Sequence, residues 1–396
     1  MHLVSGQVVF GNNYFSRQKD EAKVWRYLDR GAHLILLAPR RAGKTSLLRR
    51  LEQQPKDGYV FLYVMVQSCT TEHDFYKQAL EQLYDSDFVN NLNKFAQKGK
   101  DFITNVFSNI DKFEIASTGI KLNNKEHRLT YQDLINVIKA LKLNGKLIVV
   151  FDEYPDVIET IHNNQGHEAV SNFMKNTRTL CQDMSLGELV QFVFTGSIGL
   201  DSIAHRLQLT NLINDREKLT LSPLNENEAH AFIKFLIQKN NSPILIDKKT
   251  ANYLLKKIEW LMPYYIEILW ERLEDYCYDY DKQTPNQQDV DAAYEQLFHQ
   301  AYRSNFIHWA ERLKRFENLE RQLAKALLHT LSAEGELTLN EVFNICQEEK
   351  YQNINHHYVM DCLEHDGYLF ESQPKVYRFT SPILKDWWNR YADRTL

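Results

Sequence analysis

An apolar run near the N-terminus is followed by residues that could bind a triphosphate. Leu34–Leu37 read as a buried strand, and the residues after Lys44 have the spacing of a helix. A loop between such elements can direct backbone N–H groups and a helix N-terminus at phosphate oxygens. Lys44 would reach the β- and γ-phosphates, and the Thr45 hydroxyl would bind Mg²⁺. The predicted phosphate-binding residues are Pro39, Arg40, Arg41, Ala42, Gly43, Lys44, Thr45 and Ser46.

This loop departs from the usual G-x-x-x-x-G-K-[ST] pattern at its first position, where the chain has Ala38. Alanine is tolerated there if its φ is negative, because only a positive φ strongly favours glycine. Gly43, where the backbone must approach phosphate, is kept. The alternative is an ordinary strand–helix turn that happens to contain a Gly-Lys-Thr tripeptide.

Two adjacent carboxylates end a second apolar run, Lys146–Phe151. The β-branched composition of this run predicts a core strand of a parallel sheet, and Asp152 and Glu153 follow it. A carboxylate at this end of a strand can hold Mg²⁺, and the next one can polarise an attacking water. We therefore assign Asp152 to the metal and Glu153 to the water. The alternative is a polar loop start without a catalytic role.

Three further residues are candidates for catalysis. Thr195 ends another apolar run, and its hydroxyl could sense a γ-phosphate or simply satisfy the backbone. Arg206 and Arg216 follow that run and could supply an arginine finger to a neighbouring subunit. For both arginines the alternative is a surface salt bridge.

Composition limits the class of protein. A chain of 396 residues is too long for one compact core and indicates two or three domains. No apolar stretch has the length of a membrane span, and the five cysteines are scattered, so we expect a cytoplasmic protein without a membrane partner. The formal net charge of -5 argues against overall attraction to nucleic acid.

The order of predicted elements indicates an α/β P-loop core in residues 1–223. Helical spacing separates the strand-like runs, which implies a parallel five-stranded sheet covered by helices. An insertion at about 85–129 is predicted to be helical at Phe88–Phe95 and Phe102–Ile110 and extended at Lys112–Leu122. It could be an interaction arm or a surface elaboration. The predicted strands are His33–Leu37, Tyr59–Gln67, Leu147–Asp152, Leu189–Thr195 and Glu217–Leu221, and the predicted core helices are Thr45–Glu52, Asp74–Tyr84 and His167–Cys181.

Residues after Pro223 have helical spacing, and we interpret 224–304 as a helical lid. Its predicted helices are Glu226–Lys239, Lys248–Ile258, Pro263–Tyr276 and Gln287–Ser304. Residues 305–396 predict three helices and a hairpin, the pattern of a winged helix-turn-helix. Those elements are Glu320–Leu331, Leu339–Cys346, Ile354–His365, Tyr368–Glu371 and Val376–Thr380.

The third of these C-terminal helices contains no Lys or Arg. A winged helix that reads DNA places basic and amide side chains of this helix on bases and phosphates. We therefore favour a protein partner over DNA for this domain. The more basic stretch Arg312–Lys325 fits either a binding face or a solvated helix face.

Taken together, these segments resemble the archaeal-type ATPases of the STAND branch of the AAA+ superfamily, which are similar to the Cdc6 ATPases of origin recognition and to NACHT and NB-ARC switch proteins. The resemblance implies that Pro263 contacts the adenine or ribose and that the Phe15–Arg17 region lies beside the base. It also implies a switch in which ATP closes the lid, often with homo-oligomer formation, and in several members a role in host defence or conflict. Leu261-Met262 replace the usual Gly-Gly of the lid segment. The segments that carry the resemblance are Phe10–Arg17, Pro39–Leu48, Phe151–Pro155, Thr195–Leu200, Leu261–Ile266 and Tyr377–Trp388.

Three functions remain open from the sequence. The first is an ATP- and Mg²⁺-dependent switch that hydrolyses slowly and recognises a protein. The second is a DNA-binding ATPase of the Cdc6 kind, and the third is a pseudo-ATPase that binds nucleotide as a scaffold.

Overall fold

The chain forms two compact units in a computed structural model that describes residues 11–39, 41–86, 113–116, 119–122, 128–141, 145–196, 199–302 and 304–395. The sheet unit comprises Ser16–Ala38 and Lys44–Leu221. The helical unit comprises Pro39–Gly43, Ser222–Leu396 and the N-terminal segment up to Phe15, as far as these are described. The phosphate-loop segment is thus divided between the two units. Within the described ranges, none of the helices combines the length and the apolar character needed to cross a bilayer.

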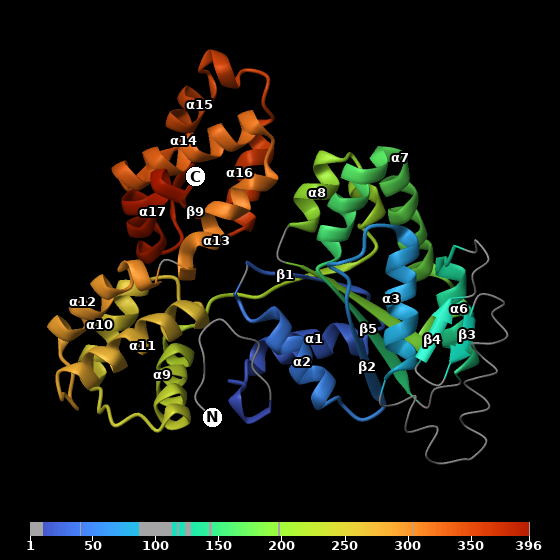
Figure 1. Cartoon of the computed structure of the whole chain (residues 1–396), viewed down its shortest axis with the longest axis horizontal. Coiled ribbons are helices and arrows are strands. Elements are labelled where there is room, and N and C mark those ends of the chain that lie inside the picture. Colours follow the sequence, from blue (N-terminus) through green and yellow to red (C-terminus); the bar gives the residue numbers. More distant parts are fainter. Residues whose placement is uncertain are drawn as a thin grey trace. The chain divides into compact units, whose positions relative to one another are not determined.

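The sheet unit contains the predicted five-stranded parallel sheet, with strand order β2-β5-β6-β1-β7 (Figure 1). Each strand lies within one or two residues of its predicted bounds. The strands are β1 (Leu34–Leu37), β2 (Tyr59–Met65), β5 (Lys146–Asp152), β6 (Val190–Thr195) and β7 (Glu217–Thr220). Among its described residues, the α-helices are α1 (Gln18–Asp29), α2 (Lys44–Gln53), α3 (Glu72–Tyr84), α6 (Tyr131–Ala140), α7 (Tyr154–Gln182) and α8 (Leu200–Arg206), and the 3₁₀ helices are η2 (Gly187–Leu189) and η3 (Thr210–Leu212).

Helices cover the sheet on both faces, which explains why its central strands are largely apolar. Helices α3, α6 and α7 pack on one face around a core that includes Phe75, Phe151 and Phe192 (Figure 1). The rings of Phe75 and Phe151 are 4.5 Å apart between centroids. On the other side, α2 contacts β2 and α1 contacts β7. A parallel strand that is buried on both faces is mostly apolar, and β6 is buried along its whole length. Its polar Gln191 donates to the Leu28 and Ala32 carbonyls.

The register of the sheet aligns the ends of three strands. Thr195 of β6 pairs with Asp152 of β5 on one side and with Leu36 of β1 on the other. Because parallel strands end at the same edge, this pairing collects the polar residues that follow β1, β5 and β6.

Between β2 and β6, one predicted helix starts at a different residue, and extended structure in the insertion is present as predicted. Helix α7 begins at Tyr154, well before the predicted start, and it is interrupted at Gly166, whose φ is 84° and ψ is 179°. The predicted segment His167–Cys181 is therefore the second half of a longer element. In the insertion, β3 (Phe113–Ala116) and β4 (Gly119–Leu122) form an antiparallel hairpin where extended structure is predicted. The predicted helices Phe88–Phe95 and Phe102–Ile110 lie outside the described residues.

The first part of the helical unit contains four long helices that start close to their predicted residues. Two of them begin with capping boxes, formed by Asn225 with Glu228 and by Asn286 with Asp289, which satisfy the first backbone N–H groups. The elements of this part are η1 (Gly11–Asn13), α9 (Glu226–Asn240), α10 (Lys248–Ile258), α11 (Pro263–Asp279), α12 (Gln287–Gln296) and η4 (Gln300–Tyr302).

The prediction of one continuous helix over Gln287–Ser304 is wrong. Helix α12 ends at Gln296, and η4 follows before α13 begins at Ser304. The Phe298 carbonyl accepts a hydrogen bond from the Tyr391 hydroxyl at 2.6 Å, and the Phe298 ring is buried. Tertiary packing of this kind overrides a local pattern that contains no Gly or Pro.

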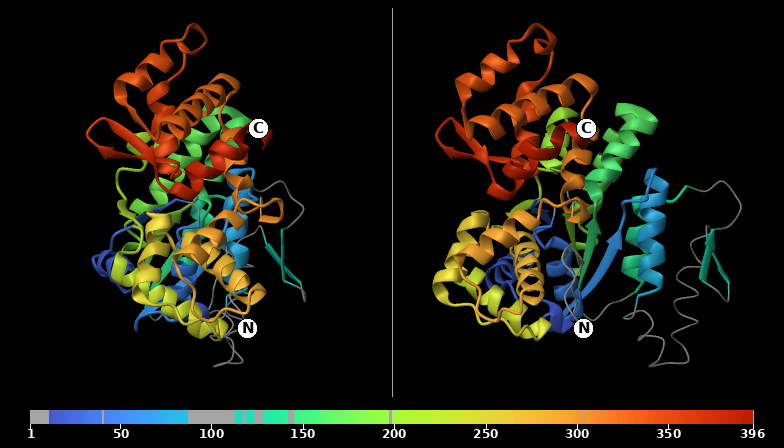
Figure 2. Two further views of the ribbon diagram at one scale, coloured as in Figure 1. Left: turned by 90° about the vertical axis from the view of Figure 1, so that its left-hand side faces the viewer. Right: turned by 60° about the vertical axis from the view of Figure 1, so that its left-hand side comes forward.

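The C-terminal part contains the three predicted helices and the hairpin, together with elements that the sequence pattern misses (orange to red in Figure 2). Strand β8 (Glu336–Thr338) pairs antiparallel with β10, which gives a three-stranded sheet of order β8-β10-β9. The winged-helix assignment itself stays a prediction. The elements are α13 (Ser304–Arg312), η5 (Leu313–Arg315), α14 (Asn318–Glu334), β8, α15 (Leu339–Cys346), η6 (Glu349–Tyr351), α16 (His356–His365), β9 (Leu369–Gln373), β10 (Val376–Phe379) and α17 (Pro382–Thr395).

Candidate nucleotide-binding site

The loop after β1 has the backbone of a tight phosphate-binding turn at two of its residues. Arg41 and Gly43 both have positive φ, 65° and 87°. A Cβ added to Gly43 would meet no heavy atom within 4 Å, so glycine is favoured there by its backbone conformation rather than by space. Ala38 is buried and is not among the described residues with positive φ, which is the condition under which alanine can stand at this position. Ala42 is also buried, and its N–H donates to the Pro39 carbonyl at 3.3 Å.

Lys44 lies at the first position of α2 and is buried. Its Nζ donates to the Ala38 carbonyl at 2.5 Å, so the ammonium binds the residue at which the loop leaves β1. To bind a phosphate oxygen in this way, the ammonium must exchange or share that carbonyl. Ser46 follows in the same first turn of α2.

The two residues predicted to bind a metal lie together, although they are 107 positions apart in the sequence. The Thr45 hydroxyl donates to Asp152 Oδ2 at 3.2 Å, and the Tyr63 hydroxyl donates to the same oxygen. The Glu153 N–H donates to Asp152 Oδ1 at 3.1 Å. The sequence analysis does not predict this contact of Tyr63, because the sequence does not show which group the hydroxyl of a tyrosine in an apolar strand will bind.

Burial dominates the electrostatics of Asp152. The residue is 1% exposed, and this desolvation raises the pKa of its carboxyl above the usual range. The charge of Glu153 acts in the same direction, whereas the hydrogen bonds from Tyr63 and Thr45 and the charge of Lys44 lower the pKa. A divalent cation at this carboxylate would offset the burial of its charge.

The donor set fits Mg²⁺. A hydroxyl and a carboxylate are hard oxygen ligands, and Mg²⁺ in a P-loop site uses one or two such groups together with phosphate oxygens and water. Thr45 and Asp152 supply one oxygen ligand each, already within hydrogen-bonding distance. Elsewhere in the described ranges, no group of three or more His, Cys, Asp or Glu side chains could hold a metal.

Glu153 is held in a left-handed backbone conformation, with φ of 62°. Its carboxylate lies beside Gly196, because a Cβ built on that glycine would be 3.3 Å from Glu153 Oε2 and 2.5 Å from Pro155 Cδ. Only a glycine fits this close approach without movement of Pro155. The carboxylate predicted to polarise water is thus next to the residue that follows β6.

Thr195 lies at the predicted edge, but its hydroxyl serves the backbone. The hydroxyl donates to the Leu36 carbonyl at 3.0 Å, and the side chain is buried. This contact matches the alternative interpretation, in which the residue satisfies a neighbouring strand.

The two candidate arginine fingers have structural partners inside the sheet unit. Arg206 forms an ion pair with Glu159 at 3.0 Å. Arg216 is 4% exposed, and its guanidinium lies 4.1 Å from the centroid of the Phe194 ring. The proposal of Arg216 as a finger for a neighbouring subunit is therefore corrected, because a buried guanidinium cannot extend from the surface.

The remaining predicted contacts are divided between the two units. In the sheet unit, Arg17 forms a buried ion pair with Asp20 at 2.8 Å. In the helical unit, the Phe15 ring packs edge-on against Phe232 and Phe235 of α9, at 5.0 and 5.6 Å between centroids. Pro263 is the first residue of α11. Arg40 lies outside the described residues.

Arg41 is half-buried within the helical unit. Its guanidinium lies 4.0 Å from the centroid of the Tyr264 ring, and its Nη1 donates to the Asn305 carbonyl at 3.1 Å. Arg41 thus binds helices α11 and α13, contacts that the loop motif alone does not predict.

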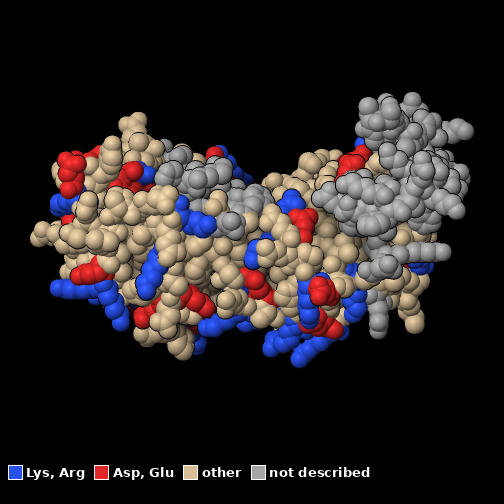
Figure 3. Space-filling view, turned by 90° about the horizontal axis from the view of Figure 1, so that it is seen from below, with Lys and Arg blue, Asp and Glu red and all other residues tan. Residues whose placement is uncertain are grey.

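The surface does not present a wide basic area on the face drawn in Figure 3, where Lys and Arg side chains are interspersed with Asp and Glu among the residues shown in colour. Helix α16 has no Lys or Arg. Glu364 of this helix is exposed, and partial desolvation together with the charges of Asp361 and Glu371 raises its pKa.

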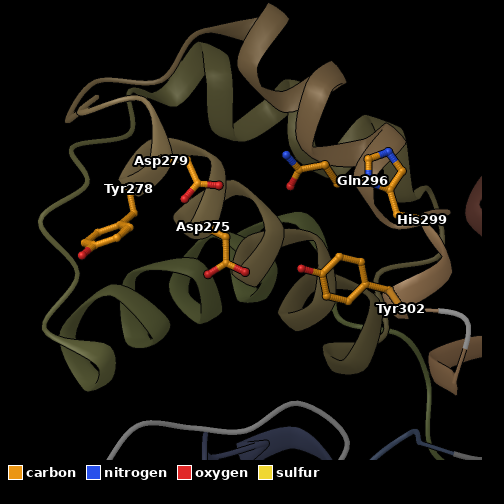
Figure 4. A pocket seen from close by; sticks show the side chains of 6 residues that line it. All are labelled: Asp275, Tyr278, Asp279, Gln296, His299 and Tyr302. Atoms are coloured by element: carbon orange, nitrogen blue, oxygen red, sulfur yellow. The ribbon is translucent and has the colours of Figure 1, made fainter.

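A separate pocket of about 420 Å³ lies within the helical unit, but its charge does not suit a triphosphate (Figure 4). Asp275 and Asp279 of α11 both line it, and carboxylates repel phosphate groups. Asp275 also forms an ion pair with Arg272 at 2.8 Å. The other lining residues are Tyr278, Gln296, His299 and Tyr302.

Comparisons with known proteins identify the fold. No protein-family model matches the sequence, and no curated protein matches it. Among solved structures, the chain is similar to a Walker-type ATPase of Pyrococcus abyssi, with 16% identity, a TM-score of 0.60, and coverage of 95% of this chain and 96% of that one. It is also similar to the ORC2 protein of Aeropyrum pernix, solved in ADPNP–ADP complexes, with 13% identity, a TM-score of 0.53, and coverage of 96% and 93%. At these identities the likeness shows the fold alone, and the chain therefore has the α/β P-loop ATPase fold of these archaeal proteins.

Proposed function

We propose that this protein is an ATP-binding switch that hydrolyses ATP slowly and couples its nucleotide state to recognition of a macromolecular partner. The triphosphate would lie against the amides from Arg40 to Thr45. Thr45 and Asp152 would hold Mg²⁺, which neutralises charge on the phosphates when bound.

One observation carries this proposal above the others. The Thr45 hydroxyl and the Asp152 carboxylate meet at 3.2 Å, where the phosphate-loop helix begins and β5 ends. A strand–helix turn without a nucleotide role would have no reason to bury a carboxylate beside that threonine and the ammonium of Lys44. The burial of Asp152 is unfavourable for its charge unless a cation compensates it.

The residues of the chain suggest how hydrolysis would proceed. Lys44 would bind the β- and γ-phosphate oxygens and stabilise the charge that develops on them. Glu153, beside Gly196, would orient the attacking water and accept its proton. Phe15, Arg17 and Pro263 would lie on the side of the base and ribose, as the resemblance to the archaeal-type ATPases implies.

Slow turnover is part of the proposal. An arginine finger can contribute roughly 10³ to 10⁵ in rate to this chemistry. The two candidate arginines are engaged within the sheet unit, Arg206 with Glu159 and Arg216 over Phe194. If hydrolysis proceeds without an arginine finger, the bound nucleotide would persist and define the conformational state of the protein. A second copy of the chain or a bound partner would then supply the arginine that speeds hydrolysis.

We further propose that the partner is a protein. Recognition of that protein would link the switch to a defence or conflict system. The acidic character around Glu364 and the lack of Lys and Arg on α16 support a protein over DNA. Retention of a labelled DNA duplex on a filter, measured across a salt series, tests the DNA-binding alternative. Retention that falls steeply with salt would favour DNA binding.

The function is tested by calorimetric titration of ATP with Mg²⁺ and by a turnover assay. We expect the wild-type protein to bind ATP more tightly with Mg²⁺ than with EDTA, and Glu153→Gln to bind ATP but to hydrolyse it more slowly. Equal turnover in the two proteins would favour the pseudo-ATPase scaffold. An absence of nucleotide binding by the wild-type protein would refute the proposal.

A further inference from the structure

Gly196 is the residue that follows β6, and the register of the sheet places it beside Glu153. Thr195 of β6 pairs with Asp152 of β5, so the residues that come after them, Gly196 and Glu153, lie at the same edge of the sheet. Gly196 is buried. Its φ is not positive, so the backbone conformation by itself does not require a glycine at this position.

The space beside Gly196 does require a glycine. A Cβ built on this residue would lie 2.5 Å from Pro155 Cδ, 2.9 Å from Pro155 Cγ and 3.3 Å from Glu153 Oε2. Ordinary contacts of a Cβ begin at 3.4 Å, so the distance to Pro155 Cδ would have to grow from 2.5 Å by about 0.9 Å. A side chain at position 196 would therefore displace either Pro155 or the end of β6.

Pro155 cannot avoid this contact by rotating its side chain. Its Cδ is bonded to its backbone nitrogen, so a movement of Cδ moves the backbone of Pro155. Pro155 lies in the first turn of α7, whereas β6 is buried along its whole length and pairs with a strand on each side. We expect the turn at Glu153–Pro155 to move rather than the central strand, because close packing holds the strand on all sides.

Glu153 would move together with Pro155, because its backbone belongs to the same turn. Its φ of 62° is uncommon for a residue with a side chain, and its carbonyl accepts a hydrogen bond from the Asp156 N–H at 3.2 Å. Its own N–H donates to Asp152 Oδ1 at 3.1 Å. A shift of the turn would therefore change the place of the Glu153 carboxylate.

We infer that Gly196 is a positioning residue for Glu153. The absence of a side chain at the end of β6 leaves room for the turn at Pro155 and for the Glu153 carboxylate that orients water. The inference rests on the proposed function and adds a residue to its hydrolytic step. Gly196 acts through Glu153 and is not itself a catalytic residue.

Four full-length proteins test the inference: the wild-type protein, Gly196→Ala, Pro155→Ala and the double variant. Pro155→Ala removes the Cδ and Cγ atoms that the new methyl group would meet, and it leaves the milder contact of 3.3 Å with Glu153 Oε2. A misplacement of about 1 Å can lower a rate by roughly 100-fold, so we expect Gly196→Ala to lower ATP turnover by about tenfold to 100-fold. The double variant should recover to within about fivefold of Pro155→Ala.

ATP affinity, measured by calorimetry with Mg²⁺, should stay within about threefold of the wild-type value in all four proteins, because the inference concerns the hydrolytic step alone. Turnover of Gly196→Ala equal to that of the wild-type protein overturns the inference, and so does a double variant that is as slow as Gly196→Ala. If Gly196→Ala alone does not fold, the double variant provides the test, because it must fold and hydrolyse ATP.

The Glu153→Gln background separates positioning of Glu153 from a general defect. If Gly196 acts through Glu153, Gly196→Ala should change the residual turnover of Glu153→Gln by less than about twofold. A further fall as large as that in the wild-type background would show that Gly196 acts on another group, and it would overturn the inference.

Thermal unfolding without nucleotide measures the contact independently of hydrolysis. Gly196→Ala should lower the unfolding midpoint, and Pro155→Ala should restore most of that loss in the double variant. Additive effects of the two substitutions overturn the inference while the proposed function stands. If the wild-type protein binds ATP without hydrolysing it, the hydrolytic part of the proposed function fails and the inference fails with it.

Discussion

Replacement of Lys44 with alanine is expected to weaken ATP binding by about 1.5 to 3 kcal/mol. The ammonium is buried at the start of α2 and makes a hydrogen bond of 2.5 Å to the Ala38 carbonyl. It therefore already lies at the phosphate loop, and α2 does not have to move to bring it there. Hydrogen bonds to charged groups contribute about 1.5 to 3 kcal/mol, which corresponds to roughly a tenfold to 150-fold loss of affinity. The variant also loses a positive charge near Asp152, which raises the pKa of that carboxyl further.

The assay is a calorimetric titration of a non-hydrolysable ATP analogue in the presence of Mg²⁺. Lys44→Met is the control, because it keeps most of the buried stem and removes only the charge. Both variants should lose affinity to a similar degree if the charge is responsible. Affinity equal to that of the wild-type protein in both variants would refute the placement of Lys44 at the phosphates.

Three further predictions concern individual contacts. Burial raises the pKa of Asp152, so ionisation of this carboxyl lowers the stability of the folded protein as pH rises through that pKa, and a bound cation offsets the loss. The thermal stabilisation by Mg²⁺ and nucleotide should therefore be smaller at pH 5.5 than at pH 8. Asp152→Asn should remove the part of this pH dependence that does not come from protonation of the nucleotide. Thr195→Val should lower the free energy of unfolding by about 0.5 to 1.5 kcal/mol through the lost bond to the Leu36 carbonyl, while turnover stays within about twofold; a tenfold fall in turnover would instead support a γ-phosphate sensor. Asp366→Asn should cost about 3 to 5 kcal/mol in urea unfolding, because Arg312 and Arg315 both pair with this buried carboxylate, and a change below 1 kcal/mol would contradict that account.

The strands, and the proximity of Thr45 in the phosphate loop to Asp152, could be predicted from the sequence because both follow from apolar runs and the polar residues that come directly after them. Continuous apolar runs predict strands that are buried on both faces. The ends of parallel strands meet at one edge, so Thr45 and Asp152 could be expected together despite their separation in the chain. Thr338 likewise caps α15, where the sequence predicts the helix start.

Contacts that depend on tertiary packing could not be predicted in this way. Nothing in the sequence around Arg216 indicates that its guanidinium lies over Phe194 in the interior. Tyr63 and Arg41 meet their partners, Asp152 and Tyr264, through side chains whose directions depend on the packed fold. The residues around a side chain can be the same whether it forms a surface ion pair, packs in the core or binds a ligand, so the sequence does not distinguish these three roles.

The most direct test of the account is a crystal structure of the protein with a non-hydrolysable ATP analogue and Mn²⁺, whose anomalous scattering locates the cation. The account predicts the triphosphate against the amides of residues 40–45, with the cation between the Thr45 hydroxyl and the Asp152 carboxylate. Nucleotide bound elsewhere, or a cation that avoids Asp152, would contradict it.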